Sequence, residues 1–161
     1  MLKPIIATAF LSAGVVLGQA GDPAGFHFWS HSDLDKMTND LAPQMDAHKM
    51  KSQTIVTEGN HRFLVTHREG PGESEYHETE SDIVYVQSGH ATLLYGGKMI
   101  DGKTTAPGEL RGTGIEGGLS KPLAPGDVVV IPTKVPHQFQ PKAGEPFNYF
   151  VVKVTDEKAS K

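Results

Sequence analysis

The sequence contains no cysteine, and this absence removes several kinds of chemistry together. Without thiols the chain has no disulfide bonds, no thiolate metal ligands and no cysteine nucleophile. Any bound metal ion must therefore be held by nitrogen and oxygen atoms. The 8 histidines and the 19 acidic residues supply such atoms.

An excess of basic residues is also missing. The 15 lysines and arginines leave a formal net charge of -4, so the chain has no basic surface for a phosphate backbone. Residues 112–117 spell G-x-G-x-x-G, yet Gly118 and Pro122 follow where a nucleotide-binding helix would have to begin. Neither a phosphate loop nor a nucleophile elbow is present. We expect a small-molecule partner and no nucleic acid.

Long apolar runs are confined to the N-terminus. The run Ile5–Leu17 follows Lys3 and precedes Gly18-Gln19-Ala20, a pattern that suits signal peptidase. It is shorter than the roughly 20 apolar residues of a membrane-spanning helix. We expect residues 1–20 to be a signal peptide. The protein would then be exported, either periplasmic or secreted, with no membrane association once the signal is removed.

The 18 glycines and 11 prolines lie between short apolar runs, a distribution that favours an all-β fold. The length suits a single core. We expect an N-terminal extension over residues 21–53, a β-barrel over 54–154 and a polar tail over 155–161. Within the extension, Ser30 as N-cap and apolar residues at helical spacing up to Pro43 predict one short helix.

A hairpin is expected where the period changes to strict alternation. In residues 61–68, His67 shares one face with the apolar Phe63 and Val65. Gly70-Pro71-Gly72 then provides a turn. Centring the hairpin on Pro71 puts His67 opposite Glu75, with Cβ atoms roughly 5 Å apart. The later stretch 98–121 is poor in apolar residues and is expected to be an irregular rim or surface excursion.

Residues of the metal-ligand type gather after this turn, in the stretch EYHETESDIVYVQSG that begins at Glu75. Glu75 and His77 are two apart and share a strand face, and Asp82 can rejoin that face after a bend. His137 begins a distant strand, directly after Pro136. Buried carboxylates need pairing or a metal, so the set is either a metal site or a polar group held by mutual hydrogen bonds.

Two stretches resemble the motifs of the cupins, small jelly-roll barrels that are also called double-stranded β-helices. The second part of the motif G-x5-H-x-H-x3,4-E-x6-G lies over residues 75–89, and G-x5-P-x-G-x2-H-x3-N is similar to residues 126–141. The matching positions are His77, Asp82 and Gly89 in the first motif, and Gly126, Pro132 and His137 in the second.

The departures from these motifs concern the ligands and one turn. Glu75 stands at the first histidine position, and Asp82 replaces a glutamate. Lys134 stands where a glycine is usual, and Pro141 replaces the final asparagine.

The resemblance implies one divalent metal ion, zinc, manganese, iron or nickel, bound by His77, Asp82, His137 and Glu75. Glu75 is open to two interpretations: it is a metal ligand, or it is a general base with His67 as its partner. His67 itself is the alternative ligand for the missing histidine.

The same resemblance implies a metal acting as a Lewis acid on a small oxygen-rich molecule, a sugar derivative or an organic acid. Glu75 or His67 would be the proton-transfer group. Lyase, isomerase and dioxygenase reactions are all compatible with it. The alternative function is a non-catalytic module that binds a small ligand without a metal. Cupins also lead us to expect a homodimer formed through the sheets.

Overall fold

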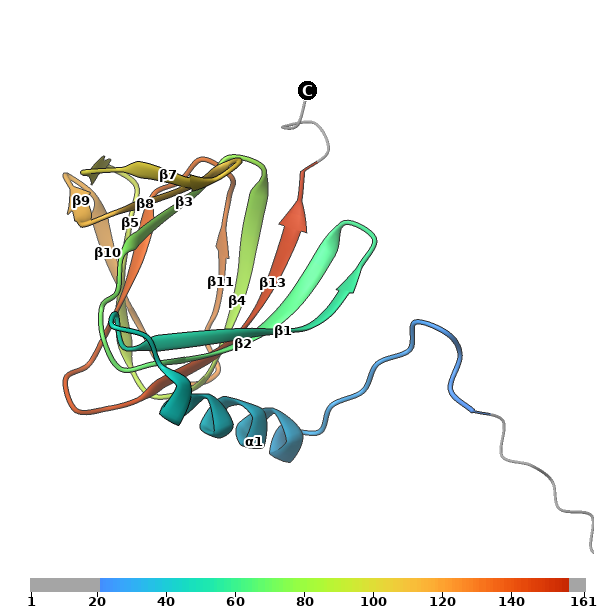
Figure 1. The fold of residues 1–161 in the computed structure, drawn as a ribbon. Helices are drawn as coiled ribbons and strands as arrows, with labels where there is room; N and C mark the ends of the chain where they lie inside the picture. Colours follow the sequence, from blue (N-terminus) through green and yellow to red (C-terminus); the bar gives the residue numbers. More distant parts are fainter. Residues whose placement is uncertain (1–20, 157–161) are drawn as a thin grey trace, which may run out of the picture.

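Two antiparallel sheets face each other and enclose the core (Figure 1). The computed structural model describes residues 21–156, so the expected signal peptide and residues 157–161 of the tail lie outside the described part. Across residues 21–156, no helix has the length and apolar character needed to cross a membrane.

The first sheet has the strand order β1-β2-β13-β4-β11. Its strands are β1 (Met50–Glu58), β2 (His61–Arg68), β13 (Phe147–Thr155), β4 (Glu80–Ser88) and β11 (Val128–Ile131). The second sheet has the order β10-β5-β12-β3-β8-β7. Its strands are β10 (Leu119–Leu123), β5 (Ala91–Tyr95), β12 (His137–Pro141), β3 (Ser74–His77), β8 (Glu109–Gly112) and β7 (Lys103–Ala106). A separate pair consists of β6 (Lys98–Ile100) and β9 (Gly114–Glu116).

Strand β4 shows how the alternation of side chains builds the core. Val84 and Val86 are fully buried. Ile83, which precedes them, and Tyr85, which lies between them, are exposed. The buried valines belong to one apolar cluster with side chains of the second sheet such as Leu93 and Phe139. Asp82 has the same parity as the valines and is buried with them, so its carboxylate needs partners inside the barrel.

The expected N-terminal helix is confirmed as α1 (His31–Leu41), which the short 3-10 helix η1 (Ala42–Gln44) follows. Ser30 caps it, and Asp33 completes a capping box by accepting from the Ser30 backbone N–H. Leu41 is buried, and α1 packs beside β2 (Figure 1). The helix therefore covers part of the outer surface of the first sheet.

The expected hairpin between β2 and β3 is wrong. Strand β2 pairs with β1 and β13, whereas β3 pairs with β12 and β8 in the other sheet. The Gly70-Pro71-Gly72 stretch therefore carries the chain across the barrel. Its path is fixed by Arg68, which is fully buried and donates from Nη1 to the carbonyl oxygen of Pro71 at 3.0 Å. Arg68 is the last residue of β2, and its side chain thus holds the segment that crosses to the other sheet.

The stretch 98–121 is not irregular as expected but contains the short strands β6 to β9 and the start of β10. Most of their side chains are exposed or half-buried, so the alternation that predicts a strand is weak there. These short strands are defined instead by the hydrogen bonds of their backbones to neighbouring strands. Strand β8 lies beside β3 and places Glu109 opposite His77, and Arg111 opposite Glu75.

Gly89, in the turn between β4 and β5, offers a prediction on stability. Its φ is +79°, and an added Cβ would lie 2.0 Å from the carbonyl oxygen of Pro146. Gly126 has a φ of +91° with no atom within 4 Å of that Cβ. We expect Gly89→Ala to lower the free energy of unfolding by about 3 kcal/mol or more, against about 1 kcal/mol for Gly126→Ala. Urea unfolding measures both, and equal losses would contradict the packing argument.

Candidate metal centre

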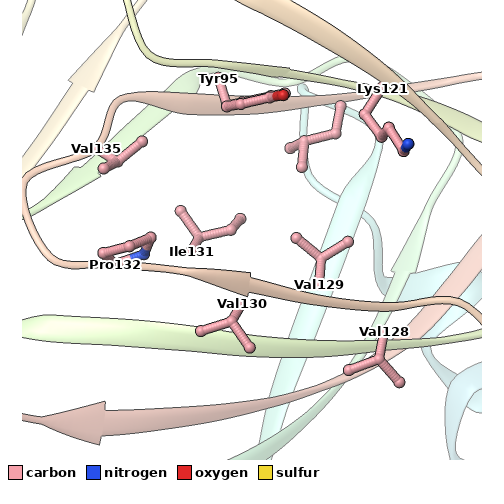
Figure 2. Close-up of a pocket in the computed structure, with 9 residues that line it drawn as sticks. Tyr95, Lys121, Val128, Val129, Val130, Ile131, Pro132 and Val135 are labelled. Carbon is pink, nitrogen blue, oxygen red and sulfur yellow. The ribbon is translucent and has the colours of Figure 1, made fainter.

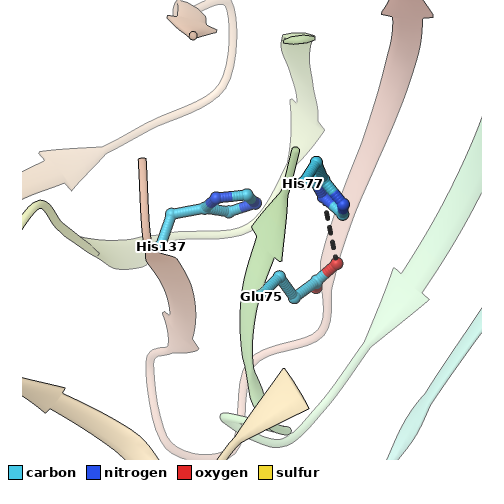
Figure 3. A group of neighbouring side chains, drawn as sticks. All are labelled: Glu75, His77 and His137. Carbon is cyan, nitrogen blue, oxygen red and sulfur yellow. Dashed lines mark ion pairs between the residues drawn. The ribbon is translucent and has the colours of Figure 1, made fainter. Parts of the chain in front are cut away.

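Glu75 and His77 on β3 and His137 on β12 form a group whose ligand atoms all lie within 4.8 Å of one another (Figure 3). Glu75 and His77 share a strand face because they are two residues apart. The register of the sheet places His137 beside Glu75. A carboxylate and two imidazoles that converge in this way could hold a metal ion.

Asp82 reaches the same group from β4 in the opposite sheet. Its Oδ2 lies 3.5 Å from Nε2 of His77 and 3.6 Å from Nε2 of His137. The structure thus brings together Glu75, His77, Asp82 and His137, with one sheet supplying three of them and the facing sheet the fourth.

The imidazole of His137 is oriented by the backbone. Its Nδ1 lies 3.0 Å from the carbonyl oxygen of Val135, and because a carbonyl only accepts, Nδ1 carries a proton, so in the neutral ring the lone pair is on Nε2. Within residues 21–156, this Nε2 is buried and has no hydrogen-bond partner. A buried lone pair directed at other ligand atoms is the arrangement found in histidine metal ligands.

The imidazole of His77 is held in the same way by Glu109. Its Nδ1 lies 2.8 Å from Glu109, which leaves Nε2 facing the group. Burial lowers the pKa of His77, but its interactions with Asp82 and Glu109 outweigh burial and raise it to about 8. Burial raises and His77 lowers the pKa of Glu109, and the net direction is down.

Lys153 on β13 enters the group as well and was not expected. It is buried, and its Nζ donates to Nε2 of His77 at 2.8 Å and to Oδ1 of Asp82 at 2.7 Å. The contact with His77 requires the neutral ring, because a protonated Nε2 has no lone pair to offer, and the ring is neutral above its pKa of about 8. Burial alone would raise the pKa of Asp82, but His137, His77 and Lys153 hold it far below its ordinary value.

Glu75 is held by arginine on both of its oxygens. Arg68 donates from Nη2 to Oε1 at 3.1 Å, and Nη2 of Arg111 lies 3.5 Å from Oε2. Burial would raise the pKa of Glu75, but Arg68, His137, Arg111 and Lys153 lower it to about 2. Glu75 is therefore a carboxylate across the neutral pH range.

His67, the other candidate proton-transfer group, does not join the group. Leu64 and Thr66 line an internal cavity together with Glu75, so His67, one residue further along β2, points to the opposite face of the sheet. Its Nε2 lies 3.2 Å from Oε1 of Glu69. In the register of the sheet it stands beside Lys51 and Asn148, not Glu75.

The space beside the ligand group is small. The internal cavity there has a volume of about 40 Å³, which is room for water and not for a sugar. A larger hollow of about 480 Å³ is lined by β11 and by residues of β5 and β10, away from the ligand group (Figure 2). Its lining is apolar apart from Lys121 and the hydroxyl of Tyr95.

Comparison with solved structures decides the fold. A Klebsiella pneumoniae protein described as having a double-stranded β-helix domain aligns with a TM-score of 0.56 at 16% identity, covering 82% of this chain and 92% of that one. The chain has the cupin fold. No protein-family model matches this chain, and no curated protein is significantly similar to it.

Two enzymes share the fold with this chain. The oxalate decarboxylase of Lactobacillus farciminis, in a formate complex, aligns with a TM-score of 0.50 at 19% identity over 68% of this chain and 30% of that one. The Fe(II) form of HppE aligns with a TM-score of 0.50 at 14% identity over 65% of this chain and 50% of that one. The chain thus spans half or less of the length of these enzymes.

Lys134 shows how this chain departs from the cupin motif and keeps its geometry. Its φ is +63°, the left-handed conformation that the usual glycine adopts easily. Its N–H donates to the carbonyl oxygen of His77 at 2.7 Å. Three residues earlier in the chain, Ile131 pairs with Asp82. The loop from β11 to β12 is thus bound to the backbone of His77 at Lys134 and begins beside Asp82 at Ile131.

Sequence reasoning missed Arg68, Glu109 and Lys153 as members of the group. A signal for Lys153 was present, because Phe147, Tyr149, Val151 and Lys153 alternate along one face of β13. Glu109 and Arg68 offered no comparable signal. Glu109 lies on a short strand with weak alternation, and Arg68 ends a strand that was predicted to form a hairpin with the next one.

Proposed function

We propose that this cupin binds one divalent metal ion through Glu75, His77 and His137, with Asp82 beside them. The observation that carries the proposal is the buried Nε2 of His137, which has no hydrogen-bond partner within residues 21–156. Two imidazoles with carboxylates suit zinc, manganese, iron or nickel. When bound, such a metal polarises an oxygen atom of a small substrate as a Lewis acid.

Of the two interpretations of Glu75, the ligand is the better supported. Arg68 engages Oε1, while Oε2 lies 3.8 Å from Nε2 of His77, on the side of the other ligands. A general base works best with a pKa near the working pH, and a pKa of about 2 is far below it. His67 is separated from Glu75 by the sheet and is not proposed as a proton-transfer group.

We propose a small organic acid as the substrate or ligand, in preference to a sugar derivative. The guanidinium group of Arg111 is partly exposed, pairs with Glu109 at 3.0 Å and lies 3.5 Å from Glu75, so it is a carboxylate-binding group at the edge of the site. The cavity of about 40 Å³ leaves little room for anything larger. Among proteins that share the fold, an oxalate decarboxylase was solved with formate. We further propose that the protein acts after export.

Metal analysis tests the proposal. Purified residues 21–161, stripped with a chelator and then titrated separately with zinc, nickel, manganese and iron(II), should retain about one equivalent of at least one ion after desalting. Retention of less than about a tenth of an equivalent of every ion would overturn it.

A second candidate function, a metal-free module that binds a small ligand, is favoured by one observation. The ammonium group of Lys153 already neutralises Asp82 and satisfies His77. If this is the working state, the titration leaves no bound metal, and an organic acid binds with unchanged affinity in the presence of a chelator. A metal-dependent protein loses that affinity.

Glu109 gives a further prediction, because it fixes the ring of His77 through Nδ1. We expect Glu109→Gln to weaken zinc binding about 10- to 100-fold, the range found when the partner of a histidine ligand is removed. Glu145→Gln is the matched control, since Glu145 accepts from Nδ1 of His90 at an exposed site. Isothermal titration calorimetry measures both, and an equal affinity for the two variants would contradict the assignment.

A further inference from the structure

We propose that Lys153 is the resident cation of the metal-free centre, and that a metal ion binds only by displacing its ammonium group from His77. The inference rests on the proposed metal binding and adds to it a residue that decides which ions bind.

The first step concerns Nε2 of His77. Lys153 donates to this atom at 2.8 Å, and an unprotonated imidazole nitrogen has one lone pair. The same lone pair is what a metal ion requires, because Nδ1 is occupied by Glu109. A hydrogen bond from Lys153 and a bond to a metal are therefore mutually exclusive at this atom.

The second step concerns Asp82, which has two oxygens with different surroundings. Oδ1 accepts from Lys153 at 2.7 Å, while Oδ2 lies at nearly equal distances from the two imidazoles, 3.5 Å from Nε2 of His77 and 3.6 Å from Nε2 of His137. Lys153 can thus leave His77 and remain paired with Oδ1. Asp82 retains the lysine, and the ligands left to the metal are Glu75, His77 and His137, whose atoms converge.

The third step is that the ammonium group is buried. Lys153 is buried on the inner face of β13 and lies between Arg62 and Asp82 in the register of the sheet. A displaced ammonium stays close to the metal and repels it, and this repulsion is strong in a buried site. Only ions that bind imidazole tightly overcome it, so zinc and nickel are accepted while magnesium and calcium are excluded.

The test compares zinc binding by the wild-type protein, by Lys153→Met and by Lys121→Met, which changes a distant exposed lysine in the same way. We expect Lys153→Met to bind zinc roughly 10- to 100-fold more tightly, the effect of removing one hydrogen bond to a charged donor. Lys121→Met should match the wild type. Equal affinities for all three would overturn the role of Lys153 and leave the metal site standing, whereas no binding by any of them overturns both.

The wild-type protein provides a second readout, which does not depend on the folding of the variant. In a protein labelled with ¹⁵N on lysine, one equivalent of zinc should shift the Nζ resonance of Lys153 and leave that of Lys121 in place. Magnesium should shift neither. An unchanged Lys153 resonance in zinc-saturated protein would overturn the displacement.

Discussion

The double variant His77→Ala/His137→Ala should retain less than about a tenth of an equivalent of zinc under conditions where the wild type retains about one. Structural zinc sites with four ligands bind with roughly 10–16 kcal/mol, so the loss of two imidazoles should weaken binding by several thousandfold or more. Elemental analysis after desalting measures the retained metal. This is the largest functional effect we expect from two substitutions.

His67→Ala is the informative control for that experiment. His67 is a buried histidine near the same region of the sequence, but its ring bonds Glu69 on the other face of the sheet. The variant should therefore keep the metal. If a folded His67→Ala protein loses its zinc, or if the double variant keeps a full equivalent, the assignment of ligands is wrong.

Arg68→Ala should lower the free energy of unfolding of the metal-free protein by about 3–5 kcal/mol, the usual effect of removing one partner of a buried ion pair. The guanidinium group is fully buried, and its Nη2 binds Glu75 and the hydroxyl of Tyr149. Without it, the carboxylate of Glu75 loses its main buried counter-charge. Chemical denaturation at neutral pH measures the change.

Arg62→Ala is the matched control for Arg68. Arg62 pairs with Glu80 with similar chemistry, but its side chain is 37% exposed. We expect a loss of about 1 kcal/mol or less at that site. The double variant Arg68→Met/Glu75→Gln should recover part of the loss, because no buried charge is then left unpaired. Equal losses for Arg68→Ala and Arg62→Ala would contradict the argument.

The parts of the site that depend on local periodicity could be predicted from the sequence. Glu75 and His77 share a face because any strand has a period of two, and His137 was located by a motif that fixes where its strand begins. The capped helix α1 was predictable for the same reason, since Ser30 and Asp33 form a local signal.

The parts that depend on which strands meet could not be predicted. Gly70-Pro71-Gly72 looks the same whether it closes a hairpin or crosses between sheets, and only the burial of Arg68 separates the two. Glu109 and Arg111 reach the site because β8 pairs with β3, and no residue of β8 indicates that partner. Lys153 had the parity of the core, but a lysine at such a position is normally assigned to solvent.

The loop from Ile131 to Lys134 is fixed to both sheets of the barrel. One end is fixed beside Asp82 by strand pairing, and the other is fixed to the backbone of His77 by the N–H of Lys134. The length of this segment therefore sets the gap between a carboxylate on one sheet and an imidazole on the other. Insertion of one residue there would shift the carboxylate of Asp82 relative to the imidazole of His77 while leaving every residue of the group in the sequence.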